Sequence, residues 1–412
     1  MSKFNMRDLM KKDGTRTILA SLLSIIIGML AGSVIITIVG LTNETLGVKG
    51  VWDGIRIVCL GLFVKGRDAA GELVFTFNPQ MMGNMLFRAI PVIMTGLSVA
   101  VANKTGLFNI GAPGQYLAGT AATLFIALYM PVEGSEMTAW HASQGIEYAM
   151  TYPAWFVWGV AFVGGMVAGA LWGAIPGLLK ALLNINEVLA CIMTNWIAAN
   201  LVTWAFDVST LKNVVENTKT GYIYKTSSNG VETAKMGLDK LFPGSQVNGG
   251  IIVAAVIAVV VYIMLTRTTF GYELKACGSN RFAARYAGIK DKRSIVISMA
   301  IAGALAGAAG SLYYLAGNTE FFWSTYQALP AVGFNGIPVA LLAANNPIAV
   351  VFTGMFMSML DICGLQLTNL TGYNEYITDV IIAVIVYLAA FSLVIKMLIG
   401  KLAGKRGKEA GK

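Results

Sequence analysis

Long apolar runs dominate this sequence and limit what it can fold into. Ten runs each approach the roughly 20 residues that a helix needs to cross the hydrocarbon core of a bilayer. Only 12% of the residues are charged, against about 25% in soluble domains. The sequence therefore predicts an all-α polytopic membrane protein with about ten transmembrane helices, some of them short or broken. The predicted crossings are residues 17–41, 82–103, 110–130, 154–179, 187–206, 250–266, 295–316, 329–345, 347–366 and 376–397.

Lysine and arginine cluster beside these runs. Because the positive-inside rule places such clusters in the cytoplasm, we expect both termini to be cytoplasmic, and the net charge of +9 does not indicate nucleic acid as a partner. The same rule assigns the chain to the inner membrane lipid bilayer with a defined order of regions. These are a basic cytoplasmic N-terminus (1–16), a transmembrane domain (17–398) with an extracytoplasmic loop (207–249) and a basic cytoplasmic loop (267–293), and a basic cytoplasmic tail (399–412).

The chain lacks the residue combinations of common active sites. His141 is the single histidine and is expected to be a solvated loop residue, so no Ser-His or Cys-His pair and no metal site is predicted. No run matches the phosphate-binding G-x-x-x-x-G-K-[ST] pattern, and any ATP must be bound by another chain. Four scattered ionisable residues, Arg88, Glu187, Asp361 and Asp379, leave an ion-coupled secondary transporter of a small polar solute as the alternative function.

Side-chain amides are the more informative polar groups in the apolar runs. Amides both donate and accept hydrogen bonds, which suits a neutral solute with hydroxyl groups or a base edge; interhelical hydrogen bonding is the competing interpretation. Aromatic rings beside these amides offer faces on which a base or sugar can stack. The solute-pathway candidates are Asn109, Gln115, Asn195, Trp196, Phe334 and Asn335.

Two further patterns concern helix packing. Small residues recur every four positions at Gly28–Gly32, Gly165–Gly177 and Gly303–Ser311, which predicts closely packed helix faces. A short motif also occurs twice, as Phe108-Asn109-Ile110-Gly111-Ala112-Pro113 and as Phe334-Asn335-Gly336-Ile337-Pro338, at opposite predicted ends of their runs. Broken segments in opposite orientation are typical of inverted-repeat transporters, so the sequence predicts an inverted repeat, with a chance match of this short motif as the alternative.

The basic loop contains a predicted short helix. Ser279 or Asn280 can cap it, and Gly288 can end it. Arg281 and Arg285 share one face, while Ala283, Ala284 and Ala287 leave room for a partner surface. Contact with anionic lipid is the alternative interpretation of this composition.

At this loop the sequence resembles the permease subunits of bacterial ABC importers for nucleosides and simple sugars. Further stretches agree in the same order over residues 82–398. Leu107 to Gln115 looks like the family motif F-N-I-G-x-x-G-Q, Asn186-Glu187-Val188 like its N-E-V segment, and Gly333 to Pro347 like its G-F-x-G-I-x-V-A-L-L segment with the N-N-P turn. The nucleoside branch is the nearer likeness. The family often has Glu where this chain has Pro113, so no role of that carboxylate is carried over.

The resemblance implies an ABC importer permease fold that moves nucleosides or related simple sugars into the cell by alternating access. It implies no cofactor on this chain, with ATP and Mg held by a cytoplasmic ATP-binding subunit, and also a second permease subunit and an extracellular substrate-binding lipoprotein. Residues 271–289 would be the helix that contacts the ATPase. The implied coupling residues are Glu273, Gly278, Asn280, Arg281, Ala284, Arg285 and Gly288.

Overall fold

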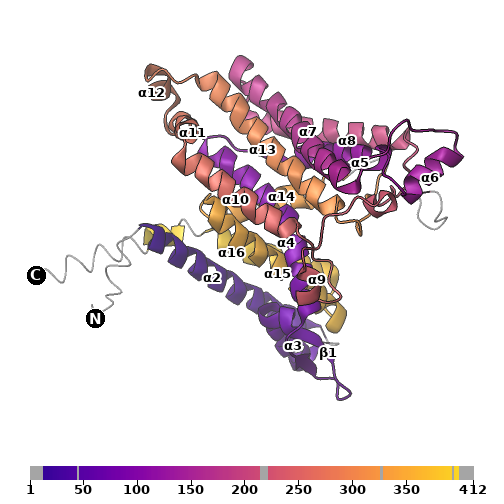
Figure 1. Ribbon diagram of the computed structural model, residues 1–412. Helices are drawn as coiled ribbons and strands as arrows, with labels where there is room; N and C mark the ends of the chain where they lie inside the picture. Colours follow the sequence, from indigo (N-terminus) through magenta and orange to yellow (C-terminus); the bar gives the residue numbers. More distant parts are fainter. Residues whose placement is uncertain (1–12, 44–45, 214–220, 325–327, 392–393, 399–412) are drawn as a thin grey trace, which may run out of the picture.

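The computed structural model describes residues 13–43, 46–213, 221–324, 328–391 and 394–398 (Figure 1). The predicted basic segments 1–16 and 399–412 therefore lie wholly or mostly outside the described residues. Apart from one antiparallel pair of strands, β1 (Val64–Arg67) and β2 (Leu73–Phe75), the regular structure in the described ranges is helical. The long helices are α2 (Asp13–Thr42), α4 (Pro79–Lys104), α5 (Ala112–Tyr129), α7 (Ala154–Leu183), α8 (Glu187–Asp207), α10 (Gly250–Arg267), α13 (Asp291–Tyr314), α15 (Pro347–Leu370) and α16 (Glu375–Ala390).

Each of the ten predicted crossings coincides with a helix. Seven described helices are long and apolar enough to cross a membrane: α2, α4, α7, α8, α10, α13 and α15. The other three positions hold α5, the 12-residue α14 (Ala331–Leu342) and α16, which is described over 16 residues. The all-α polytopic membrane fold is confirmed. The count of ten crossings and the inverted repeat stay predictions.

Short elements occupy the two ends of the helix bundle. We call the end with α11 (Thr269–Ser279) and α12 (Arg281–Tyr286) the basic end. The opposite end, which we call the loop end, carries the remaining short elements (Figure 1). These are α3 (Gly47–Leu60), η1 (Gly61–Phe63), the β1–β2 hairpin, α6 (Glu136–Ser143), η2 (Thr226–Asn229) and α9 (Leu238–Leu241).

The predicted glycine seams are confirmed as helix contacts. A Cβ atom added at Gly169 of α7 would meet the carbonyl oxygen of Gly303 and lie 2.9 Å from Cα of Gly307, both on α13. One at Gly173 would lie 3.0 Å from Cα of Gly303. At a separate contact, a Cβ atom at Gly28 of α2 would lie 2.6 Å from the carbonyl oxygen of Ile385 on α16. Lipid gives apolar helices little drive to associate, and backbone contact through small residues supplies the packing energy instead.

Helix α4 runs through the centre of the bundle. In its most apolar 18-residue window 89% of the residues are buried, the largest share among the seven candidate spans. It packs against α10, α13, α14 and α15. One end of α4 reaches the loop end and the other reaches the basic end, so α4 connects the two ends of the bundle.

Helix α3 packs against α2 and α15 and is followed by the β1–β2 hairpin, which was not predicted. Asp53 of α3 is buried, and its carboxylate accepts a hydrogen bond from Arg67 of β1 at 2.7 Å. Arg67 also donates to the carbonyl oxygen of Leu370 at the end of α15. This arginine therefore fixes the hairpin to both helices.

The expectation that His141 is a solvated loop residue is wrong. His141 lies on α6 with 1% of its surface exposed, and its Nδ1 atom is 3.0 Å from the hydroxyl of Tyr148. Its imidazole also packs against Tyr129 and Trp140. Ser135 caps α6, and the aromatic side chains that cover the helix were too far apart in sequence to be recognised as one cluster.

Candidate functional site

The helix pair at the basic end forms because two polar caps start its members. The hydroxyl of Thr268 accepts a hydrogen bond from the Gly271 N–H at 3.0 Å and begins α11. The side chain of Asn280 accepts from the N–H groups of Phe282 and Ala283, both at 3.0 Å, and begins α12. Gly288 then adopts φ +84°, a left-handed conformation that suits glycine and ends the segment. The predicted short capped helix is confirmed.

Backbone contact seats α11 on the turn between α4 and α5. A Cβ atom added at Gly278 would lie 2.5 Å from the carbonyl carbon of Thr105 and 2.6 Å from the nitrogen of Gly106. One added at Gly106 would lie 2.6 Å from Cα of Gly278. Thr105 in turn shares a hydrogen bond with Ser298 of α13. The end of α11 is therefore in direct contact with two of the most buried helices.

The two arginines of α12 face inward and share one carboxylate. Arg281 Nε donates to Asp291 Oδ2 at 2.5 Å, and Arg285 donates to the same oxygen at 2.7 Å. The Asp291 side chain is 8% exposed, and it raises the pKa of Arg285 above its usual value. Asp291 begins α13, so these bonds connect α12 to the α7–α13 pair. The shared face of Arg281 and Arg285 is confirmed. Their common partner, Asp291, was not predicted from the sequence.

Aromatic side chains form the exposed face of this helix pair. Phe282 is 74% exposed and Tyr286, one helical turn later, is 96% exposed. Tyr272 on α11 is 68% exposed, and the carboxylate residue Glu273 beside it is exposed as well. Ala284, which was expected at the open surface, is instead buried at 4% exposure. Ala284 is buried because it lies on the same side of α12 as Arg281 and Arg285, and this side faces Asp291.

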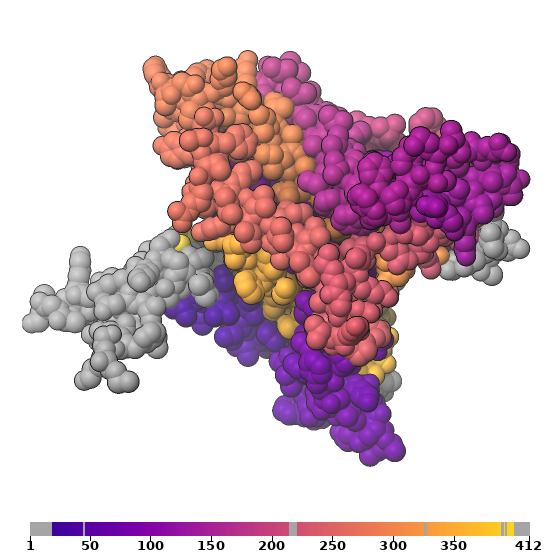
Figure 2. Space-filling view, viewed as in Figure 1, coloured from indigo at the N-terminus to yellow at the C-terminus, as the bar shows by residue number. Residues whose placement is uncertain are grey.

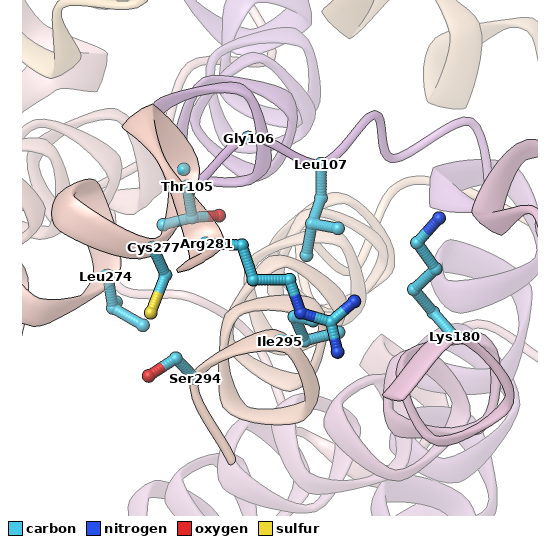
Figure 3. A pocket seen from close by; sticks show the side chains of 10 residues that line it. Thr105, Gly106, Leu107, Lys180, Leu274, Cys277, Arg281, Ser294 and Ile295 are labelled. Carbon is cyan, nitrogen blue, oxygen red and sulfur yellow. The ribbon is translucent and has the colours of Figure 1, made fainter. Parts of the chain in front are cut away.

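A pocket of about 210 Å³ lies behind α11 and α12 (Figure 3). Its walls come from the α4–α5 turn, α7, α11, α12 and α13. Arg281 extends into it toward the side where Lys180 lies (Figure 3). Lys180 forms an ion pair with Glu187 of α8 at 2.9 Å. Since both cations of this pocket have acidic partners, its charge is largely balanced.

Three of the predicted pathway amides belong to one buried cluster at the start of α5. Asn109 and Gln115 exchange two hydrogen bonds, of 2.8 Å and 3.0 Å, and Asn109 also donates to the Ser98 hydroxyl at 3.0 Å. Asn195 of α8 accepts from the Gly114 N–H at 2.9 Å and donates to the Ile110 carbonyl at 3.0 Å. These amides therefore hold the first turn of α5 in place, as the interhelical interpretation expects.

The two copies of the repeated motif meet inside the bundle. A Cβ atom at Gly333 of α14 would lie 2.6 Å from Cα of Pro113 on α5. Gly336 packs equally closely on α4, where its Cβ atom would lie 2.5 Å from the carbonyl carbon of Thr95. Thr95 also donates a hydrogen bond to the Val332 carbonyl at 3.1 Å. Pro113 and Gly333 thus bring two helix N-termini together.

The remaining pathway candidates flank this junction and point away from the core. Trp196 is 53% exposed on α8, next to the buried Asn195, and Phe334 is 37% exposed on α14, next to the buried Gly333. Asn335 is half-buried. The structure therefore divides the six candidates into three buried amides that hold α5 and three residues with exposed or half-buried side chains.

These features define a helical transport subunit of the membrane, with a rigidly attached helix pair at one end and a broken-helix junction inside. The family described as "Branched-chain amino acid transport system / permease component" matches residues 81–390. The chain belongs to this family of permeases, which are membrane subunits of ABC transporters.

Characterised relatives are similar over almost the whole chain. The chain is 32% identical over 390 residues to the guanosine ABC transporter permease protein NupP of Bacillus subtilis, covering 94% of this chain and 97% of the relative. It is 33% identical over 398 residues to the nucleoside ABC transporter permease protein NupB of Lactococcus lactis, covering 97% of each. The glucose ABC transporter permease protein TsgB13 of Haloferax volcanii is 28% identical over 367 residues, 87% of this chain and 88% of the relative. A second Bacillus guanosine permease protein, NupQ, is 22% identical over 272 residues.

Proposed function

We propose that this chain is the permease subunit of an ATP-driven importer that carries nucleosides. The observation that supports this most strongly is the near full-length similarity to two permeases named for guanosine and nucleosides. The glucose permease has lower identity over a smaller share of the chain, so a simple sugar is the second choice of solute.

We place the chain in the cytoplasmic membrane of a bacterium, with the basic end inside. Seven lysines and arginines lie between Arg267 and Arg293, and the positive-inside rule keeps such clusters in the cytoplasm. Helices α11 and α12 are then cytoplasmic, and the hairpin, α6 and α9 are extracytoplasmic. The extracellular substrate-binding lipoprotein would deliver solute to this loop end.

We assign α11 and α12 as the contact with a partner ATP-binding subunit, which holds the ATP and Mg. Phe282 and Tyr286 are too exposed for apolar rings that remain in water, so they are the side chains that enter the partner. The backbone seat at Gly278 and the arginine pairs to Asp291 would pass the partner's movement to α4 and α13. Asn280 and Gly288 serve this role by fixing where α12 begins and ends.

We assign the solute pathway to Trp196 on α8 and to Phe334 and Asn335 on α14, the two helices that pack against α5. A second permease subunit would close the pathway over these exposed residues, and the paired Bacillus permeases NupP and NupQ support such a second subunit. Trp196 and Phe334 would stack on a base or sugar, while Asn335 would hydrogen-bond to it. Asn109, Gln115 and Asn195 act on the pathway by positioning α5.

The experiment is reconstitution of the permease pair with its ATPase and binding protein in liposomes. Guanosine uptake should require ATP and all of these subunits. Replacing Phe282 and Tyr286 together with Ser should abolish co-purification of the ATPase and reduce uptake at least tenfold. Tyr376→Ser, at a 77% exposed tyrosine of α16, is the matched control and should have no effect. Uptake by this chain alone under a proton gradient would show a secondary transporter and contradict the proposal.

A further inference from the structure

We propose that a polar pocket at the loop end is a binding subsite for a neutral nucleoside before it enters the pathway; this rests on the proposed function and orientation. The pocket has a volume of about 330 Å³, within the usual range of small-molecule sites. It is formed by the start of α4, the turn before α10 and the end of α15, none of which carries a pathway candidate. Its polar lining residues are Gln80, Asn84, Arg88, Gln246, Gln366 and Asn369.

The wall of this pocket is held in place by its own contacts. Asn84 of α4 accepts a hydrogen bond from the backbone N–H of Gln246 at 2.9 Å. Gly83 precedes Asn84, and Ser245 precedes Gln246. Gly83 packs so closely on Ser245 that a Cβ atom added at Gly83 would overlap the Ser245 side chain. The turn before α10 is therefore fixed on α4, next to α9 (Figures 1 and 2). A preformed wall lowers the ordering cost of binding a small solute.

Several polar groups of the pocket are available to a ligand. Among the described residues, the side chains of Gln80, Gln366 and Asn369 have no hydrogen-bond partner, and Arg88 has neither a hydrogen bond nor an ion pair. Each amide can donate and accept, and the guanidinium adds donors in a fixed plane. A nucleoside presents the matching groups, because its hydroxyls donate and accept and its base carries carbonyl and ring-nitrogen acceptors.

Arg88 gives this pocket its strongest indication of a ligand. It lies ten residues into a candidate membrane span, where a charged side chain is costly and usually faces a polar cavity or a partner. Five of the six polar residues that line the pocket carry neutral amides, which match the hydroxyls and base edge of a neutral nucleoside.

The test measures guanosine binding to the assembled transporter in nanodiscs without binding protein, and uptake kinetics in liposomes with it. Arg88→Gln and Gln366→Leu should each weaken guanosine binding and raise KM for uptake at least tenfold, with kcat within about twofold of the wild type. Gln366→Asn, which keeps the amide, should retain most of the affinity. Gln144→Leu, at an exposed amide elsewhere on the loop end, should behave as the wild type.

Three results would overturn the subsite. The first is unchanged guanosine binding in both Arg88→Gln and Gln366→Leu. The second is binding of guanosine monophosphate more than tenfold tighter than that of guanosine, which would identify an anion site. The third is a loss confined to the affinity for the binding protein, which would identify a protein docking surface. Failure of the proposed function is distinct, because the wild-type transporter would then show no ATP-dependent guanosine uptake.

Discussion

Gly106 and Gly278 touch backbone to backbone, although 172 positions separate them in the sequence. Gly106 adopts φ +74° in the turn after α4, and Gly278 lies near the end of α11. No side chain fits between them, since a Cβ atom on either residue would lie 2.6 Å from backbone atoms of the other. The junction between the helix pair at the basic end and the rest of the bundle is therefore a direct backbone contact.

Enlarging this contact should separate ATP hydrolysis from transport. In Gly278→Val the side chain overlaps Thr105 and Gly106, and overpacking of this kind costs about 1–3 kcal/mol, so α11 must move off its seat. We expect guanosine uptake to fall at least tenfold while ATPase activity of the assembled transporter persists. Gly159→Val is the control, because a Cβ atom at Gly159 meets nothing within 4 Å. Parallel loss of uptake in both variants would contradict the prediction.

Removing the shared carboxylate should loosen α12 without unfolding the bundle. Asp291→Asn leaves Arg281 and Arg285 without an anionic acceptor, and charge-assisted hydrogen bonds are stronger than those between neutral groups. Since Arg285 is half-exposed, solvent screening lowers its share. Amide hydrogen exchange of residues 281–287 should become roughly tenfold faster in nanodiscs. This increase corresponds to a loss of about one kcal/mol or more in the free energy of local opening. Lys292→Gln is the control and should leave exchange unchanged. Unchanged exchange in Asp291→Asn would contradict the prediction, because it would show that the arginine pairs do not hold α12.

The buried amides should prove structural when they are replaced. Asn195→Leu leaves the Gly114 N–H and the Ile110 carbonyl without partners, at a cost of about 1–3 kcal/mol for each buried group. We expect a lower melting temperature in detergent together with reduced uptake. Asn200→Leu provides the comparison, because this exposed amide bonds only to the Trp196 carbonyl of its own helix and should not change the melting temperature. An unchanged melting temperature in Asn195→Leu would contradict this structural role.

The α6 region should lose stability in mild acid. Burial lowers the pKa of His141 below its usual value of 6.5, so the folded region binds fewer protons than the opened one. The stabilisation is complete above pH 6.5 and declines as the pH falls through the lowered pKa. The protection factors of residues 136–143, which correct exchange for its intrinsic rate at each pH, should therefore be lower at pH 5.5 than at pH 7.5. Because the chain has no other histidine, His141→Phe should remove this pH dependence, and its persistence would contradict the assignment.

Helix positions and local caps were predictable because they depend on neighbouring residues. The apolar runs, the Asn280 cap and the glycine spacing of α7 each follow from a pattern within one segment. Partners distant in sequence were not predictable. Asp291 is a partial exception, since its position shortly after Arg285 is a signal that could have revealed the arginine pairs.

The candidate site was predicted less completely than the fold. Asn109 and Asn195 were recognised as important amides. Whether each one contacts a solute or another helix depends on which groups face it in three dimensions, and the sequence does not show this. The same limit applies to Phe282 and Tyr286, whose exposure follows from the inward turn of Arg281. His141 was misjudged because its aromatic neighbours come from separate segments.

The glycine seam between α7 and α13 determines where this protein can hinge. Gly169 and Gly303 are in backbone contact with no side chains between them. A change of side-chain rotamer therefore cannot let one helix move past the other here, and we expect α7 and α13 to move together. Asp291 joins α12 to one end of that pair. A force applied to α12 would therefore reach α7 and α13 together and would not be absorbed between these two helices.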